Sequence, residues 1–326
     1  SSDEVKNRIY SKNPYPGLIR LLEHPDEQVV SDAIIQVFFL LQTGSNTSPD
    51  KKPHPHYESI QACDGINKIF ALFQKNVRQY SRDRSALCIG FLFRAREIAD
   101  PIMRQEIINH LKSLLNDSDT LMKEKAKKAL KYLAQNDVNR SEILNENELK
   151  KIEKDLKQSI EGTTKQKKSI LQKQENDLLF LSQILENEDE EEDDDNDEFI
   201  KPIIHSRIVE SLLIIFSNRN LNQITRIYSE TFFNLTSNSS DEIKLLIYNK
   251  KPYPGLIHLL EHQDDKIASD AIISIFLLLE TGTITNQDNE HHPHFESIQA
   301  CDGINKIFAL FQKNVRKYSR DRSALC

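Results

Sequence analysis

Two histidines and a glutamate in the second half of the chain stand in an order that can do chemistry. His258, Glu261 and His262 fit H-x-x-E-H, in which two imidazoles one helical turn apart hold Zn²⁺ and the carboxylate acts as a base. The same stretch occurs earlier with Arg20 in the first position, and a guanidinium cannot bind zinc. So short a match also arises easily by chance. We therefore expect no catalytic residue, metal or cofactor, and a chain that is not an enzyme.

Further histidines fall close enough together to suggest a metal site. They are His54 and His56 in the loop 44–57, and His291, His292 and His294 in the loop 282–295. Neither group has a cysteine or a carboxylate at ligand spacing. We expect them to belong to surface loops without metal.

A block rich in arginine and tyrosine occurs twice, at 77–84 and at 315–322, with one change between the two. Arginine and tyrosine are favoured at the energetic centres of protein interfaces. The alternative is that Asp83 caps a helix and pairs with the arginines, or that the segment was copied recently. The binding interpretation predicts partner contacts from Arg78, Tyr80, Arg82, Arg84, Arg316, Tyr318, Arg320 and Arg322.

The composition favours helices as the elements that position these residues. Eight glycines in 326 residues are too few for the turns of a many-stranded sandwich, and none stands in a nucleotide-binding loop. Residues 1–88 return at 239–326 with a constant offset of 238, and 64 of the 88 positions are identical. We infer that the chain is a fragment of a longer repeat array.

A shorter unit lies inside this duplication. Leu18, Leu21 and Leu22 form an apolar helix face, and Asp26 follows at the position that would cap a second helix. The same spacing returns from Leu111 and from Leu256. Looser versions begin at Gly65 and at Ile208. Each unit is therefore expected to be a helix, a tight turn and a second helix, and such units bury their apolar faces by stacking.

These residues resemble the armadillo repeat over about three quarters of the chain. The resemblance is carried by 18–22 with Asp26 and Ala33, and by 111–115 with Asp119 and 126–134. It implies an all-α fold, a right-handed α-solenoid of stacked helical units. It also implies a concave surface, formed by the last helix of each unit, that binds extended peptides or protein partners.

The resemblance does not extend to nuclear-import receptors. Members of the family that bind import signals have an Asn, often near a Trp, on the last helix of successive repeats. This chain has no Trp, and at that position it has Phe39, Phe91 and Tyr132 and only once an Asn, Asn234. An import-receptor mode is not expected, although Asn234 stays a candidate contact.

The repeats define the expected domain boundaries. Residues 1–140 and 199–326 would each hold about three armadillo-like units, the last one truncated. The charged segment 141–185 would be a helical hairpin inserted between them, with a coiled-coil arm as the alternative. Eleven of the thirteen residues at 186–198 are acidic, which predicts a disordered loop. The alternative is an acidic ligand that docks on 123–131 or 165–173.

Charge and cysteine content limit the partners. The net charge is −7, but without the acidic run 39 acidic residues stand against 43 basic ones, which is weak support for a nucleic-acid surface. No membrane span or leader is seen, and the four cysteines have no C-x-x-C spacing. We expect a soluble protein of the cytoplasm, with the nucleus as the alternative.

Two functions fit these observations. The first is a non-catalytic scaffold that binds a partner protein or peptide on the concave face of the solenoid. The second is a regulatory or targeting solenoid of a larger enzyme, such as a protein kinase, whose catalytic domain lies outside the sequence. RNA binding on such a solenoid would need basic and aromatic residues at one position of each unit, and only scattered ones are seen.

Overall fold

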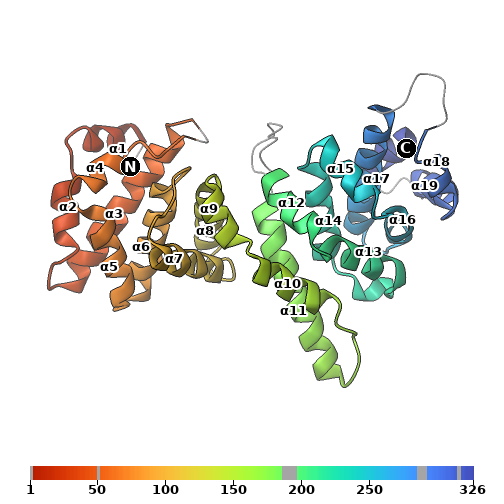
Figure 1. The fold of residues 1–326 in the computed structure, drawn as a ribbon, viewed down its shortest axis with the longest axis horizontal. Helices are drawn as coiled ribbons and strands as arrows, with labels where there is room; N and C mark the ends of the chain where they lie inside the picture. Colours follow the sequence, from red (N-terminus) through yellow and green to blue (C-terminus); the bar gives the residue numbers. More distant parts are fainter. Residues whose placement is uncertain (1–2, 50–51, 186–196, 285–291, 314–316) are drawn as a thin grey trace. The chain divides into compact units, whose positions relative to one another are not determined.

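The computed structural model describes residues 3–49, 52–185, 197–284, 292–313 and 317–326. The helices of these residues form two compact units, Ser1–Asn145 and Glu146–Cys326 (Figure 1). The first unit contains α1 (Asp3–Tyr10), α2 (Tyr15–Leu21), α3 (Glu27–Asn46), α4 (Tyr57–Gln61), α5 (Gly65–Lys75), α6 (Gln79–Leu92), α7 (Pro101–Leu114), α8 (Thr120–Ala134) and α9 (Asp137–Ile143).

The second unit contains α10 (Glu146–Leu156), α11 (Thr164–Leu185), α12 (Asp197–His205), α13 (Ile208–Asn218), α14 (Arg226–Ser237), α15 (Asp241–Tyr248), α16 (Tyr253–Leu259), α17 (Asp265–Ile284), α18 (Phe295–Gln299), α19 (Gly303–Lys313) and α20 (Lys317–Leu325). A short 3-10 turn, Leu221–Gln223, precedes α14. Residues 141–185, for which the sequence predicts a charged hairpin, contain the end of α9 followed by α10 and α11. Of the predicted acidic loop, 186–196 lie outside the described residues, and residues 197 and 198 begin α12.

The predicted aspartate caps are present. Asp26 accepts a hydrogen bond from Gln28 N at 2.8 Å, and Asp119 accepts one from Leu121 N at 2.9 Å. Asp264 accepts one from Lys266 N at 2.9 Å. Each bond satisfies a backbone donor that the first helical turn leaves free, so the second helix of each unit begins at a defined residue.

In the first unit, α2, α5 and α7 pair with α3, α6 and α8, and the latter three pack against one another in chain order. Their shared core is fully buried and includes Val37, Leu41, Ile89 and Leu133. In the second unit, α11, α14, α17 and α20 form the corresponding row, with α10, α13, α16 and α19 beside it. The described residues thus form the all-α stack of helical units that the sequence predicts.

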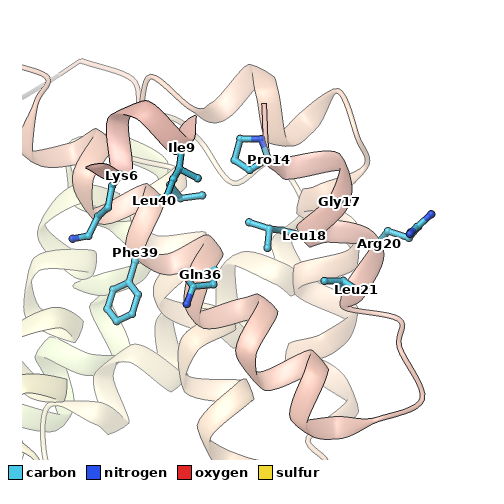
Figure 2. A pocket seen from close by; sticks show the side chains of 10 residues that line it. All are labelled: Lys6, Ile9, Pro14, Gly17, Leu18, Arg20, Leu21, Gln36, Phe39 and Leu40. Atoms are coloured by element: carbon cyan, nitrogen blue, oxygen red, sulfur yellow. The ribbon is translucent and has the colours of Figure 1, made fainter. Parts of the chain in front are cut away.

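The two copies of the duplicated segment differ in what covers their first helix. In α16, a Cβ added to Gly255 would lie 2.9 Å from Phe216 Cβ and 3.0 Å from the Leu213 carbonyl oxygen, because α13 packs directly on this residue. In α2, a Cβ added to Gly17 would meet no atom within 4 Å. Gly17 instead lines an open pocket (Figure 2). The same helix is therefore covered in one copy and open in the other.

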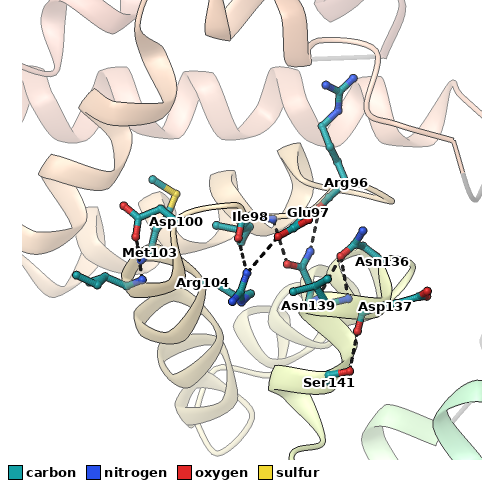
Figure 3. Close-up of polar contacts among 12 residues, drawn as sticks. Arg96, Glu97, Ile98, Asp100, Met103, Arg104, Asn136, Asp137, Asn139 and Ser141 are labelled. Carbon is teal, nitrogen blue, oxygen red and sulfur yellow. Dashed lines mark hydrogen bonds and ion pairs between the residues drawn. The ribbon is translucent and has the colours of Figure 1, made fainter.

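A buried asparagine holds the connection between α6 and α7 (Figure 3). The Asn139 side chain is completely buried; its Oδ1 accepts from Ile98 N at 3.1 Å and its Nδ2 donates to the Arg96 carbonyl at 2.9 Å. Asn136 caps α9 by accepting from two backbone N–H groups. A loop without secondary structure is thus fixed on the last helix of its unit.

The two glycines give a matched test of this packing. Gly17→Ala should stabilise the protein by roughly 0.5 kcal/mol, because alanine favours the helix and nothing opposes the added methyl group. Gly255→Ala should destabilise it by about 1–3 kcal/mol, because α13 must move away. Urea unfolding of both variants measures the difference, and equal effects would contradict the packing described for α16.

Candidate functional site

The arginines predicted at 77–84 take different roles. Arg78 Nε donates to Glu27 Oε2 at 2.7 Å, which joins the start of α6 to the start of α3. The Arg82 guanidinium lies 4.7 Å from the centre of the Phe73 ring and is half-buried there. Arg82 thus packs against α5, whereas Arg78 links α6 to the first turn of α3. Their positions favour a structural role within the stack.

Asp83 does not cap a helix or pair with these arginines, as the alternative interpretation expected. It lies inside α6 and accepts hydrogen bonds from Gln79 Nε2 at 2.7 Å and from His110 Nε2 at 2.8 Å. The last bond joins α6 to α7. The helix begins at Gln79, so the position of Asp83 is one turn too late for a cap.

Tyr80 and Arg84 lie together on the surface of α3, α6 and α8. The Arg84 guanidinium is 5.2 Å from the Tyr80 ring centre and 5.4 Å from that of Phe38. Lys125 Nζ from α8 lies 4.9 Å from the Phe38 ring centre and 5.9 Å from that of Phe39. We call Arg84, Lys125, Tyr80, Phe38 and Phe39 the cationic face.

The two cations of this face are poorly compensated. Among the described residues, neither Arg84 nor Lys125 forms an ion pair with a carboxylate, and Nε and Nη1 of Arg84 are buried without a hydrogen-bond acceptor. Burial, and next the charge of Arg84, lower the pKa of Lys125. Aromatic rings stabilise cations only in part. The face therefore holds positive charge that a carboxylate from outside would neutralise.

Two more lysines extend the charge around this face. Lys6 Nζ lies 5.7 Å from the Phe39 ring centre, and Lys128 Nζ lies 5.7 Å from that of Tyr132. The arginine-tyrosine block alone does not identify these residues. A signal was present for two of them, since Lys125 and Lys128 fall within the basic stretch 123–131.

The second copy repeats part of this arrangement. Arg322 lies 4.3 Å from the Phe276 ring centre, as Arg84 lies over Phe38. Arg320 Nε is 3.6 Å from the Asp321 carboxylate. Arg316 and the side chain of Tyr318 fall outside the described residues.

Asn234 lies inside the stack. Its side chain is 6% exposed, and Nδ2 donates to Ser182 Oγ at 3.0 Å. The bond ties α14 to α11. This placement leaves the amide little surface for a partner.

The paired histidines are buried, and the prediction of surface loops is wrong for them. His56 Nδ1 and the Tyr15 hydroxyl share a hydrogen bond of 2.6 Å, and the His56 ring stacks on Tyr10 at 3.6 Å. His54 Nε2 is 2.8 Å from the Leu41 carbonyl oxygen. Both rings can be buried because their nitrogens have hydrogen-bond partners inside the protein, the Tyr15 hydroxyl and the Leu41 carbonyl oxygen.

The second copy contains the same arrangement. His294 Nδ1 lies 2.6 Å from the Tyr253 hydroxyl and its ring stacks on Tyr248, while His292 Nε2 lies 3.0 Å from the Leu279 carbonyl oxygen. His291 is outside the described residues. In both copies the first histidine of the pair thus contacts a backbone carbonyl of the preceding long helix, α3 or α17, and the second contacts a tyrosine hydroxyl.

The H-x-x-E-H histidines also bind backbone. His258 Nδ1 lies 2.5 Å from the Phe216 carbonyl oxygen, and His262 Nε2 lies 3.0 Å from that of Leu221. Across the described residues, no group of three or more His, Cys, Asp or Glu side chains is arranged to hold a metal ion.

No family model matches this chain, and no curated protein matches it. Similar solved structures include a designed armadillo repeat protein, 13% identical with a TM-score of 0.41, which covers 81% of this chain and 99% of its own. A second designed armadillo repeat protein, in complex with the peptide (KR)4, is 13% identical with a TM-score of 0.43 and the same coverage. An engineered protein is 15% identical with a TM-score of 0.42 and covers 82% of this chain and 98% of its own. The likeness concerns the fold alone.

Among the helices of the described residues, none is both long enough and apolar enough to cross a bilayer.

The buried histidines predict a loss of stability in acid. Burial lowers the pKa of His54 to about 3 and that of His56 to about 4, below the 6.5 expected in an unfolded chain. The unfolded chain therefore takes up protons first as the pH falls below 6.5, and stability is lost progressively toward pH 4. At pH 5 the loss should be on the order of 2 kcal/mol for His56.

Urea unfolding at pH 7 and pH 5 tests this, with the double variant His54→Gln and His56→Gln compared at both values. The variant should be less stable at pH 7 but should lose less stability between pH 7 and pH 5 than the parent. An equal loss would show that these histidines do not titrate in this way.

Proposed function

We propose that this chain is a non-catalytic protein-binding scaffold that holds an acidic, extended peptide segment of its partner on the cationic face. The observation that carries the proposal is the pair of neighbouring cations, Arg84 and Lys125, neither of which forms an ion pair within the described part of the chain. A carboxylate placed beside them would be attracted by both charges and would supply an acceptor for the Arg84 guanidinium, whose Nε and Nη1 have none in the described residues.

Burial makes these charges costly without a partner. Lys125 is 9% exposed, and it lies close enough to Arg84 for each charge to destabilise the other. Such a cost is typical of binding sites, where stability is given up for recognition. A bound carboxylate reverses it, so binding should raise the pKa of Lys125 and weaken with salt.

The aromatic side chains suggest what else the peptide carries. Tyr80 is 42% exposed, and Phe39 is half-buried beside Lys125. Rings of this kind receive apolar or aromatic side chains at interfaces. The favoured ligand is therefore a segment in which acidic and apolar residues alternate, because an extended chain presents alternate side chains to the same face.

Fluorescence anisotropy with labelled (Glu-Ala)6 tests the charge recognition, with labelled (Lys-Ala)6 as the opposite-charge control. The acidic peptide should bind and the basic one should not. Lys125→Met should weaken binding at least tenfold, about 1.4 kcal/mol, while thermal stability is kept or raised because a desolvated charge is removed.

Lys75→Met is the matched control. Lys75 is exposed at the end of α5, and its loss changes the net charge by the same amount. Equal weakening by the two variants would show a general charge effect and contradict a site at Lys125. Preference for a single-stranded RNA oligonucleotide over the acidic peptide would contradict the proposed partner class.

A further inference from the structure

The buried lysine of the cationic face stands at a position that other helices of the stack fill with an acid. Lys125 follows the capping aspartate of α8 at the same distance as Asp32 follows that of α3 and Asp270 follows that of α17. Asp270 is 8% exposed and accepts a hydrogen bond from Ser229 Oγ of α14 at 2.7 Å. In α17, therefore, the neighbouring helix supplies a partner for the charge that is buried at this position.

In α8 the neighbouring helix brings a second cation instead. The Arg84 guanidinium of α6 lies 5.4 Å from the Phe38 ring centre, and Lys125 Nζ lies 4.9 Å from the same point. Burial and then the charge of Arg84 lower the pKa of Lys125, and the opposing effect of Asp119, which caps α8, is smaller than either. Within the described residues, Lys125 thus has neither an ion pair nor a hydrogen-bond acceptor, although it is only 9% exposed.

Two charges and three donor groups define what would neutralise this site. Nε and Nη1 of Arg84 are buried without an acceptor in the described residues, and Lys125 Nζ is the third donor. One carboxylate brings a single negative charge and two oxygens. A phosphate monoester brings a charge of about −1.5 to −2 at pH 7 and three strongly accepting oxygens. The phosphate therefore matches both the charge and the number of donors, whereas one carboxylate matches neither.

We propose that the partner segment presents a phosphoserine to Arg84 and Lys125, so that its binding depends on phosphorylation. This inference rests on the function proposed above and names the chemical group that the cationic face selects. The planar guanidinium donates from two nitrogens to two phosphate oxygens, and the ammonium group acts on the third as a point charge. Tyr80, which is 42% exposed beside Arg84, receives the neighbouring apolar side chain of the peptide.

Fluorescence anisotropy of the full chain with four labelled peptides tests the proposal. The parent peptide is (Glu-Ala)6; in two others a central Glu is replaced by Ser or by phosphoserine. The fourth matches the charge of the phosphopeptide, because the alanine after that Glu is also changed to Glu. The phosphopeptide should bind about tenfold more tightly than the parent and charge-matched peptides, because only phosphoserine concentrates the charge at one point. The serine peptide should bind most weakly.

Three variants locate this preference for phosphate. Lys125→Met leaves one cation, so the preference over the parent peptide should fall from about tenfold to about twofold. Arg84→Lys keeps the charge but loses the paired donors, and it should also reduce the preference. Lys75→Met removes an exposed charge at the end of α5 and should leave the preference unchanged. Far-ultraviolet circular dichroism checks the fold, and Arg84→Lys, which alters no charge, decides the matter if Lys125→Met does not fold.

The outcomes separate this inference from the function on which it rests. If the parent peptide binds through Lys125 but the phosphopeptide binds no more tightly, the phosphate inference fails and the acidic-peptide function stands. If no acidic peptide binds, both fail. Equal binding of the charge-matched peptide, or a preference that survives in both Lys125→Met and Arg84→Lys, would also overturn the inference. Tighter binding to vesicles that contain a phosphoinositide monophosphate than to the phosphopeptide would overturn the choice of a peptide.

Discussion

A pair of short helices cannot bury its own apolar face, and every other property of this chain follows from the need of each unit for a neighbour. The contact that meets this need joins a phenylalanine to a residue of variable size, histidine in α7 and glycine in α16. The two helices meet at the same positions in both places, although the residue opposite the phenylalanine differs. The contact is therefore defined by how the helices are spaced, and the repeated leucines set that spacing.

Much of the fold could be predicted because helical periodicity and capping are local. The aspartates at positions 26, 119 and 264 cap where the pattern requires, since a carboxylate needs only the next turn of backbone as its partner. The prediction of surface loops is wrong for the histidines because their partners are distant in sequence. His56 finds Tyr15 across 41 positions of sequence, and nothing in the loop itself reports a buried hydroxyl.

The candidate site was predictable only in part. The arginine-tyrosine block includes Tyr80 and Arg84, which lie together in the structure. It also includes Arg78, which pairs with Glu27, because successive residues of a helix point in different directions. Lys125 comes from α8, which belongs to the next helix pair along the chain. The residues of such a surface come from separate segments of the sequence, so no single motif contains them. Their shared positive charge becomes apparent only when the helices are packed together.

The carboxyl group of Asp270 opposes the effect of the buried histidines on stability. Asp270 accepts a hydrogen bond from Ser229 Oγ at 2.7 Å, and burial raises its pKa to about 6. The folded chain therefore binds a proton at this carboxyl group at a higher pH than the unfolded chain does, so the group adds stability as the pH falls through 6. Two buried groups of opposite charge type thus give the stack opposite responses to the same acid.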